Sequence, residues 1–313
     1  MIKIMKISNS ITKFVEKLQI ETNLNLTSDA ISDDDIKLIM NYLKQQAPHI
    51  AYVEDRIVNT EDVKIPIRIY EPENIKSKKA ILFIHGGGWC SGTLDMAEIS
   101  LRKIANKVGC KVFSIDYRLA PNSKFPKGLE DCLAVTQWLQ ENAENLDIDK
   151  NKLVIMGESA GANLATALNL KLKNEYGIQF WKQILFYPAV DARVLTNDEN
   201  NNYESMLQFQ DGPLLTKSTM QQCYQLYLNN TSEILNPYVS PIQAKYLNDI
   251  SDTMIYTAEY DPLRDEGEAY GQLLIENGNT VTMRRMLGLI HGFFIMPIDE
   301  MDLAVEDIAS LIH

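Results

Sequence analysis

A serine held between two glycines is the residue of this chain whose surroundings most directly suggest chemistry. Ser159 is the centre of Gly-Glu-Ser-Ala-Gly at residues 157–161, which follows an apolar run at 153–156 and precedes a helical run that we expect to begin at Asn163. The glycines leave room for a sharp turn in which the serine is strained. A serine in such a turn can attack a carbonyl group. The amides at the start of the following helix would then stabilise the negative charge that forms on the carbonyl oxygen. The alternative is an ordinary strand-to-helix turn whose glycines only permit close packing.

A strand followed by this sharp turn and a helix resembles the nucleophile elbow of α/β-hydrolases. A second glycine-rich loop fits the same chemistry, because the apolar run at 80–84 leads directly into His-Gly-Gly-Gly-Trp at 85–89. Acyl transfer needs amides that stabilise the oxyanion of the tetrahedral intermediate, and glycines leave such amides uncovered. We assign the oxyanion hole to the amides of Gly86, Gly87 and Ala160. Phosphate binding is the alternative, but neither phosphate-loop pattern is present.

The general base can be sought by elimination, since the chain has four histidines. His85 opens the glycine loop and is better suited to bracing it, His49 precedes every hydrolase-like strand, and His313 is the last residue. His291 follows the strand-like run at 280–286, and loops at the carboxyl ends of late strands carry reactive groups in parallel sheets. We therefore predict that His291 is the base, against the alternative of a histidine packed in the core.

The third member of a catalytic triad should be a carboxylate between Ser159 and His291, because α/β-hydrolases use the order Ser, Asp or Glu, His. Asp261 is our choice. It follows the strand-like run at 253–258 and precedes Pro262, which can start a helix. An aspartate before proline is also a good helix N-cap, and the two roles are compatible.

Six motifs in order between about residue 80 and 294 resemble the hormone-sensitive-lipase family of esterases. This resemblance implies the triad Ser159, Asp261 and His291 with the oxyanion donors given above. Asn-Ser at 122–123 departs from the Glu-His usual in the family, and Glu158 stands where many members carry Asp. The motifs are His-Gly-Gly-Gly-Trp at 85–89, Tyr-Arg-Leu-Ala-Pro at 117–121, Gly-Glu-Ser-Ala-Gly at 157–161, Tyr-Pro at 187–188, Asp-Pro-Leu-Arg-Asp-Glu-Gly at 261–267 and His-Gly-Phe at 291–293.

The elements that must position these residues predict an α/β-hydrolase fold. From residue 80 onward apolar runs alternate with helical ones, which indicates a mainly parallel central sheet with helices on both faces. Residues 51–70 predict two antiparallel strands. We expect a catalytic domain over 51–313, N-terminal helices within 1–50 that contribute to a cap, and a cap insertion around 191–240, where the alternation stops.

The cap is expected to close a substrate pocket over the serine. Four large apolar residues in the glycine loop and the insertion are the candidates for its wall: Trp89, Met206, Leu207 and Phe209. The equally good alternative is that each belongs to the private core of the cap.

Composition narrows the function further. Lys and Arg total 30 and Asp and Glu 42, a net charge of −12, which argues against nucleic acid or an anionic membrane as partner. No apolar run near the amino terminus suits a signal peptide, and none elsewhere is long enough to span a membrane. Four cysteines without ligand-like spacing indicate free thiols, and we expect a cytoplasmic protein.

We therefore expect a serine carboxylesterase that hydrolyses short- to medium-chain carboxylic esters through an acyl-enzyme, with a small-molecule ester as substrate and with no metal and no organic cofactor. An amidase or deacetylase with the same triad is an alternative of the same class. A ligand receptor on the same fold is an alternative of another class, although the plant gibberellin receptors, which resemble this family, lack the histidine. A homodimer is left open.

Overall fold

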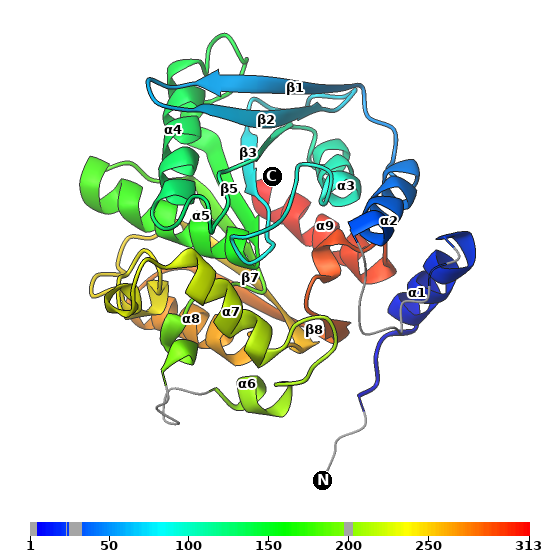
Figure 1. Ribbon diagram of the computed structural model, residues 1–313. Helices are drawn as coiled ribbons and strands as arrows, with labels where there is room; N and C mark the ends of the chain where they lie inside the picture. Colours follow the sequence, from blue (N-terminus) through cyan, green and yellow to red (C-terminus); the bar gives the residue numbers. More distant parts are fainter. Residues whose placement is uncertain (1–4, 23, 25–32, 197–202) are drawn as a thin grey trace.

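An eight-stranded sheet runs through the part of the chain that the structure, a computed structural model, describes: residues 5–22, 24, 33–196 and 203–313 (Figure 1). The strand order is β1-β2-β4-β3-β5-β6-β7-β8. β1 and β2 pair antiparallel, as does β2 with β4, and the other neighbours are parallel. The strands are β1 (Tyr52–Asn59), β2 (Lys64–Glu71), β3 (Ala80–Ile84), β4 (Lys111–Ile115), β5 (Leu153–Glu158), β6 (Lys182–Phe186), β7 (Asp252–Tyr260) and β8 (Val281–Ile290).

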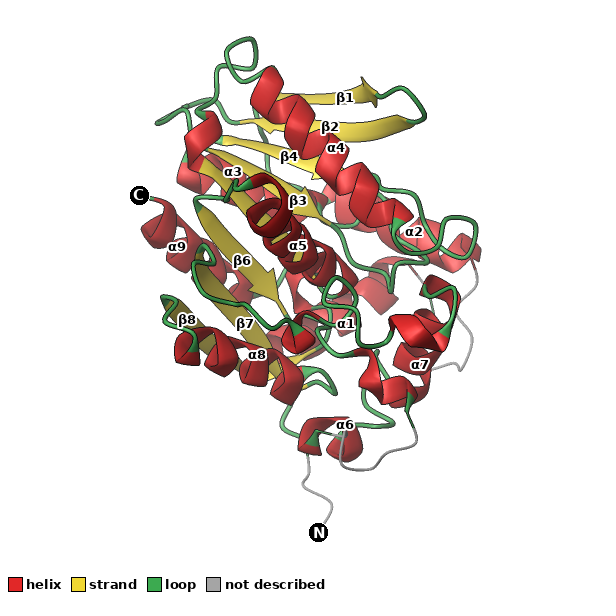
Figure 2. Cartoon of the chain, turned by 90° about the vertical axis from the view of Figure 1, so that its left-hand side faces the viewer, coloured by secondary structure: helices red, strands yellow, loops and turns green. Residues whose placement is uncertain are grey.

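Helices cover both faces of the sheet, as expected. α4, α5 and α8 lie on the face toward the viewer in Figure 2, and α3 and α9 lie on the other. Because successive strand residues point to opposite faces, β3 contributes Leu82 to one apolar cluster and Phe83 to the other. The helices are α1 (Asn9–Thr22), α2 (Asp33–Gln45), α3 (Glu98–Val108), α4 (Lys127–Glu141), α5 (Ala160–Lys171), α6 (Glu204–Gln208), α7 (Lys217–Tyr227), α8 (Arg264–Glu276) and α9 (Asp299–Ile312).

The two N-terminal helices lie outside the sheet, beside α9 (Figure 1). The segment before α1 is attached at the end of the last strands: the Lys6 amide donates to the Tyr260 hydroxyl over 2.9 Å, and the Ser8 amide donates to the Gly288 carbonyl over 2.9 Å. Side-chain hydroxyls of Ser8 and Ser10 donate to the carboxylate of Glu300 in α9. The N-terminal segment therefore reaches the edge of the sheet that carries Asp261 and His291.

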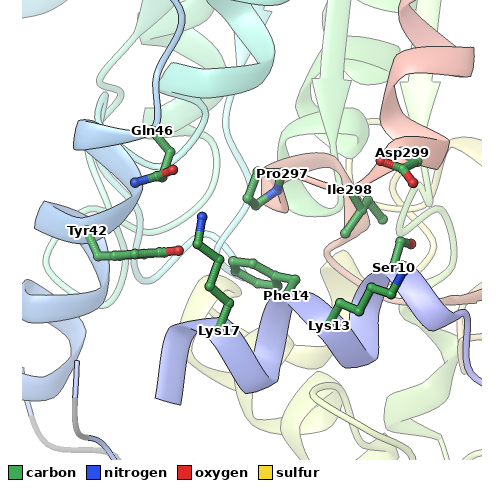
Figure 3. Close-up of a pocket in the computed structure, with 9 residues that line it drawn as sticks. All are labelled: Ser10, Lys13, Phe14, Lys17, Tyr42, Gln46, Pro297, Ile298 and Asp299. Carbon is green, nitrogen blue, oxygen red and sulfur yellow. The ribbon is translucent and has the colours of Figure 1, made fainter. Parts of the chain in front are cut away.

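A pocket of about 230 Å³ separates these helices from the start of α9 (Figure 3). Phe14 and Ile298 form its apolar side, and the side chain of Lys17 extends along it. None of the candidate catalytic residues lines this pocket. The lining residues are Ser10, Lys13, Phe14, Lys17, Tyr42, Gln46, Pro297, Ile298 and Asp299.

The expected insertion corresponds to the connection between β6 and β7, which carries α6, α7 and several short turns. The division into a catalytic domain, N-terminal helices and a cap stays a prediction. All four cysteines are free, as expected. Among the described residues, no helix has both the length and the apolarity that crossing a membrane requires.

Candidate active site

The serine turn has the strained geometry that its flanking glycines suggested. β5 ends at Glu158 and α5 begins at Ala160, so Ser159 alone makes the turn, with φ +54° and ψ −121°. A Cβ on Gly161 would lie 2.1 Å from the carbonyl oxygen of Ile84 in β3, a distance that no side chain allows. The helix starts at Ala160, three residues before the expected Asn163. The first helical hydrogen bond is the one that the Asn163 amide donates to the Ser159 carbonyl over 3.1 Å.

The fold brings Ser159, His291 and Asp261 into one chain of hydrogen bonds. His291 Nε2 lies 2.9 Å from Ser159 Oγ, and His291 Nδ1 lies 2.8 Å from Asp261 Oδ2. An ionised carboxylate only accepts, so Nδ1 carries the proton and Nε2 is left to accept from the serine hydroxyl. Asp261 is fully buried, and its Oδ1 accepts from the Leu263 amide over 2.9 Å. The two partners follow β7 and β8 at the carboxyl edge of the sheet, the edge at which β5 presents the serine.

The glycine loop requires one correction to the predicted oxyanion hole. The Gly86 amide donates to the buried carboxylate of Glu158, so its hydrogen is not free for a substrate. Among the described residues, the amides of Gly87, Gly88 and Ala160 have no acceptor. Gly88, which the sequence argument did not assign, has the free amide that Gly86 lacks. Glu158, beside the serine, is the residue that could have indicated this pairing. Its contact with Gly86 spans 72 residues of sequence, so no local pattern shows it.

Comparison with known proteins identifies the family of this chain. A family model described as the alpha/beta hydrolase fold matches residues 81–295, more than half of the chain. The chain belongs to this family. The hydrolase is 33% identical to an arylesterase of Saccharolobus solfataricus, over 79% of both chains, and 32% identical to an ethyl acetate hydrolase of Pseudomonas putida, over 78% of this chain and 76% of the relative. Its structure is similar to that of a hyperthermophilic esterase from Pyrobaculum calidifontis, with a TM-score of 0.84, 31% identity and 98% of both chains covered. The resemblance to hormone-sensitive-lipase-type esterases is confirmed.

His85 of the hydrolase supports the glycine loop from inside. Its ring is buried, lies with Nδ1 2.8 Å from the Gly86 carbonyl oxygen and stacks on Tyr117 at a centroid distance of 4.5 Å. Since a carbonyl only accepts, Nδ1 carries the proton of the neutral ring. Burial lowers the pKa of His85 to about 4, because a charged imidazole would lose its hydration there. His85 is thus a neutral donor at neutral pH.

This gives a prediction for acid stability. Since the pKa of His85 falls from 6.5 in the unfolded chain to about 4 in the folded one, protonation favours unfolding. Its contribution is complete above pH 6.5 and is lost as the pH falls toward 4. In His85→Gln, whose amide does not titrate, the free energy of unfolding should fall less between pH 7.5 and 4.5, by about 2 to 3 kcal/mol. Urea unfolding at both pH values measures this, and equal falls in parent and variant would contradict a buried neutral ring.

The four candidate pocket residues differ in how far they are buried and in what they pack against. Trp89 is buried and packs between Tyr224 and Tyr227 of α7, with centroid distances of 4.7 and 4.6 Å. The insertion therefore covers the loop that carries the free glycine amides. On α6, Met206 is buried and Leu207 is half exposed, and the nearby Phe209 ring meets Tyr260 edge-on at 5.9 Å.

A pocket wall built from these four residues stays a prediction. Leu214, which we did not include, is a further candidate, because its Cδ2 would lie 2.9 Å from a Cβ on Gly292, next to His291. Its side chain is 66% exposed.

Proposed function

We propose that this hydrolase is a serine carboxylesterase that acts on short- to medium-chain esters through an acyl-enzyme. The observation that carries the proposal is the hydrogen-bond chain from Ser159 Oγ through His291 to Asp261. The relatives support the ester as the bond that is cleaved, since one is an arylesterase and another an ethyl acetate hydrolase.

In the proposed acylation, Ser159 Oγ attacks the ester carbonyl while His291 Nε2 takes its proton. Asp261 holds the imidazole with its proton on Nδ1 and stabilises the cation that forms. The carbonyl oxygen becomes negative and is stabilised by the unpaired amides of Gly87, Gly88 and Ala160, at the start of α5. His291 then gives its proton to the leaving alcohol, and an ester of Ser159 remains.

Deacylation repeats these steps with water as the nucleophile. His291 takes a proton from the water, the same amides stabilise the second oxyanion, and Ser159 regains its proton as the acid leaves. Each proton transfer passes through His291, so this route needs no metal and no organic cofactor.

Acyl-chain length tests the proposal and its pocket. If the cap closes an apolar wall over the serine, each added methylene should raise kcat/KM about fourfold, the equivalent of about 0.8 kcal/mol, until the chain meets the wall. Longer chains must then displace packed side chains at a cost of about 1–3 kcal/mol. We expect rates on p-nitrophenyl esters to rise from acetyl to about butyryl or hexanoyl and to drop sharply by about dodecanoyl.

Initial rates below the solubility limit of each ester provide the measurement. A maximum at long chains, with activation at a lipid–water interface, would instead indicate a true lipase. Comparing p-nitrophenyl acetate with p-nitroacetanilide separates the esterase from the amidase alternative, because the two substrates differ only in the bond that is cleaved. No turnover of any ester or amide would favour a receptor.

The proposal also covers where the enzyme is located and which partners it binds. We propose a cytoplasmic enzyme with a small-molecule substrate and without a nucleic-acid partner. The net charge of −12 supports the last point, because nucleic-acid sites need a basic face. A homodimer stays open, and sedimentation of the purified chain would decide it.

A further inference from the structure

Two buried polar side chains next to the candidate triad, those of Glu158 and Tyr187, have no role in the proposed acylation and deacylation steps. Glu158 precedes the serine and is 4% exposed, and Tyr187 follows β6 and is fully buried. Burying a carboxylate is costly unless donors surround it, so its presence in this position calls for a function. Each of the two residues contacts a different part of the site.

Glu158 contacts the glycine loop directly. Its Oε1 accepts from the Gly86 amide, and the three atoms of its carboxyl group lie 2.3–2.6 Å from the place that a Cβ on Gly86 would take. The carboxylate therefore packs against the loop backbone with no atom between them. Since Gly87 follows in the chain, fixing the peptide of Gly86 also fixes where the next two amides can lie.

Tyr187 contacts the histidine loop. Its hydroxyl accepts from the Phe294 amide over 3.2 Å, and its ring lies on the His291 ring at a centroid distance of 4.5 Å. The same hydroxyl is close enough to the Glu158 carboxylate for each group to shift the pKa of the other, and Glu158 pairs across the sheet with Phe186, the residue before Tyr187. The backbone at Tyr187 has φ +36°, an uncommon conformation for a residue other than glycine, so the surrounding structure holds it in a strained position.

We infer that Glu158 and Tyr187 form one buried brace that sets the distance between the oxyanion loop and His291. Both are positioning residues for the proposed function, on which this inference rests. The brace acts because an oxyanion donor is effective only within about 2.7–3.1 Å of the developing charge, so small shifts of the loop are costly. A substrate carbonyl must meet the glycine amides and the serine–histidine pair at once, and the two side chains connect these parts.

The charges agree with this arrangement. Burial raises the pKa of Glu158, whereas His291, the Gly86 amide and the Tyr187 hydroxyl oppose that rise by favouring the ionised form. Burial together with the nearby Glu158 charge raises the pKa of Tyr187, so its hydroxyl stays protonated and can donate. Tyr117 is a further titratable group near Glu158.

Three variants test the brace. Tyr187→Phe removes the hydroxyl but keeps the ring against His291, and Glu158→Ala removes the carboxylate both from the Gly86 amide and from beside the Tyr187 hydroxyl. We expect kcat to fall about 10-fold and about 100-fold respectively, less than or equal to the loss of a whole oxyanion donor, with KM changed less than threefold. Glu158→Gln should recover most of the loss, because its amide can accept from Gly86 and fills the space beside the Tyr187 hydroxyl. Tyr270→Phe is the matched control, since Tyr270 is equally buried but lies on α8 and, among the described residues, forms no hydrogen bond with the glycine loop or the His291 loop.

Two further results decide the inference. If the residues act as one unit, Glu158→Ala with Tyr187→Phe should cost no more than Glu158→Ala alone. A trifluoromethyl ketone, which forms an oxyanion on the serine, should lose affinity in parallel with kcat/KM. Additive losses, a kcat near the parent value in Glu158→Ala, or no recovery in Glu158→Gln would overturn the brace.

Hydrogen–deuterium exchange tests the brace without relying on turnover. Tyr187→Phe should speed exchange in the peptide that covers residues 85–92, which Tyr187 itself does not hydrogen-bond, whereas Tyr270→Phe should not. Unchanged exchange in Tyr187→Phe would overturn the brace even in an active esterase. Lack of esterase activity in the parent would overturn the proposed function and leave the exchange result to decide the brace.

Discussion

Replacing Ser159 with alanine is expected to remove about four to six orders of magnitude of esterase activity while the fold is kept. In the proposed mechanism this hydroxyl attacks the substrate and gives its proton to His291 Nε2, 2.9 Å away, so no acyl-enzyme can form without it. Alanine fits the turn, because the β-carbon is already present and only the hydroxyl is lost. Hydrolysis of p-nitrophenyl acetate, with circular dichroism to check the fold, provides the measurement.

Ser114→Ala is the matched control for this substitution. Ser114 is buried in β4, and its hydroxyl has no hydrogen-bond partner within the described part of the chain. Its loss should leave activity within about twofold of the parent, since a surplus hydroxyl contributes little. If Ser159→Ala retains more than a few per cent of the parent rate, another residue is the nucleophile.

Asp261→Asn should cost about four orders of magnitude in kcat, a loss larger than its small change in shape suggests. Asp261 Oδ1 accepts from the Leu263 amide, so the carbonyl oxygen of the asparagine will stay there. Its NH₂ group then faces His291 Nδ1, which must become an acceptor. The proton moves to Nε2, and the imidazole can no longer take the serine proton.

Two measurements check this account. The Nδ1 proton of His291 should give a low-field NMR signal in the parent and none in Asp261→Asn. Asp252→Asn is the control at the opposite end of β7, where the carboxylate pairs with Lys182 over 2.6 Å. Activity near the parent level in Asp261→Asn would show that a different carboxylate orients the imidazole.

Local patterns singled out the three candidate triad residues because each stands beside a strand end. Ser159 lies in a motif whose glycines are required by backbone contacts, and Asp261 and His291 follow strand-like runs that correspond to β7 and β8. The alternation of strands and helices was enough to place all three strand ends at one edge of a parallel sheet.

Local sequence patterns could not predict contacts between segments that are far apart in the chain. Whether Gly86 or Gly88 offers a free amide depends on the Glu158 side chain, 72 residues away. The role of Tyr187 depends on Phe294, which is 107 residues away and meets it only after the sheet has formed. The packing of Trp89 on α7 belongs to the same class, because the insertion has no repeating pattern that gives its position.

The strand order also has a consequence for how this enzyme is made. β5, which carries the nucleophile, is in the middle of the sheet, whereas β7 and β8 are added at one edge and are the last strands to be synthesised. Chains fold from the N-terminus as they leave the ribosome. A growing chain can thus complete its serine turn long before any base reaches it. With His291 as the proposed base, hydrolysis must wait until β8 has joined the sheet, and a chain that ends before β8 is expected to be inactive.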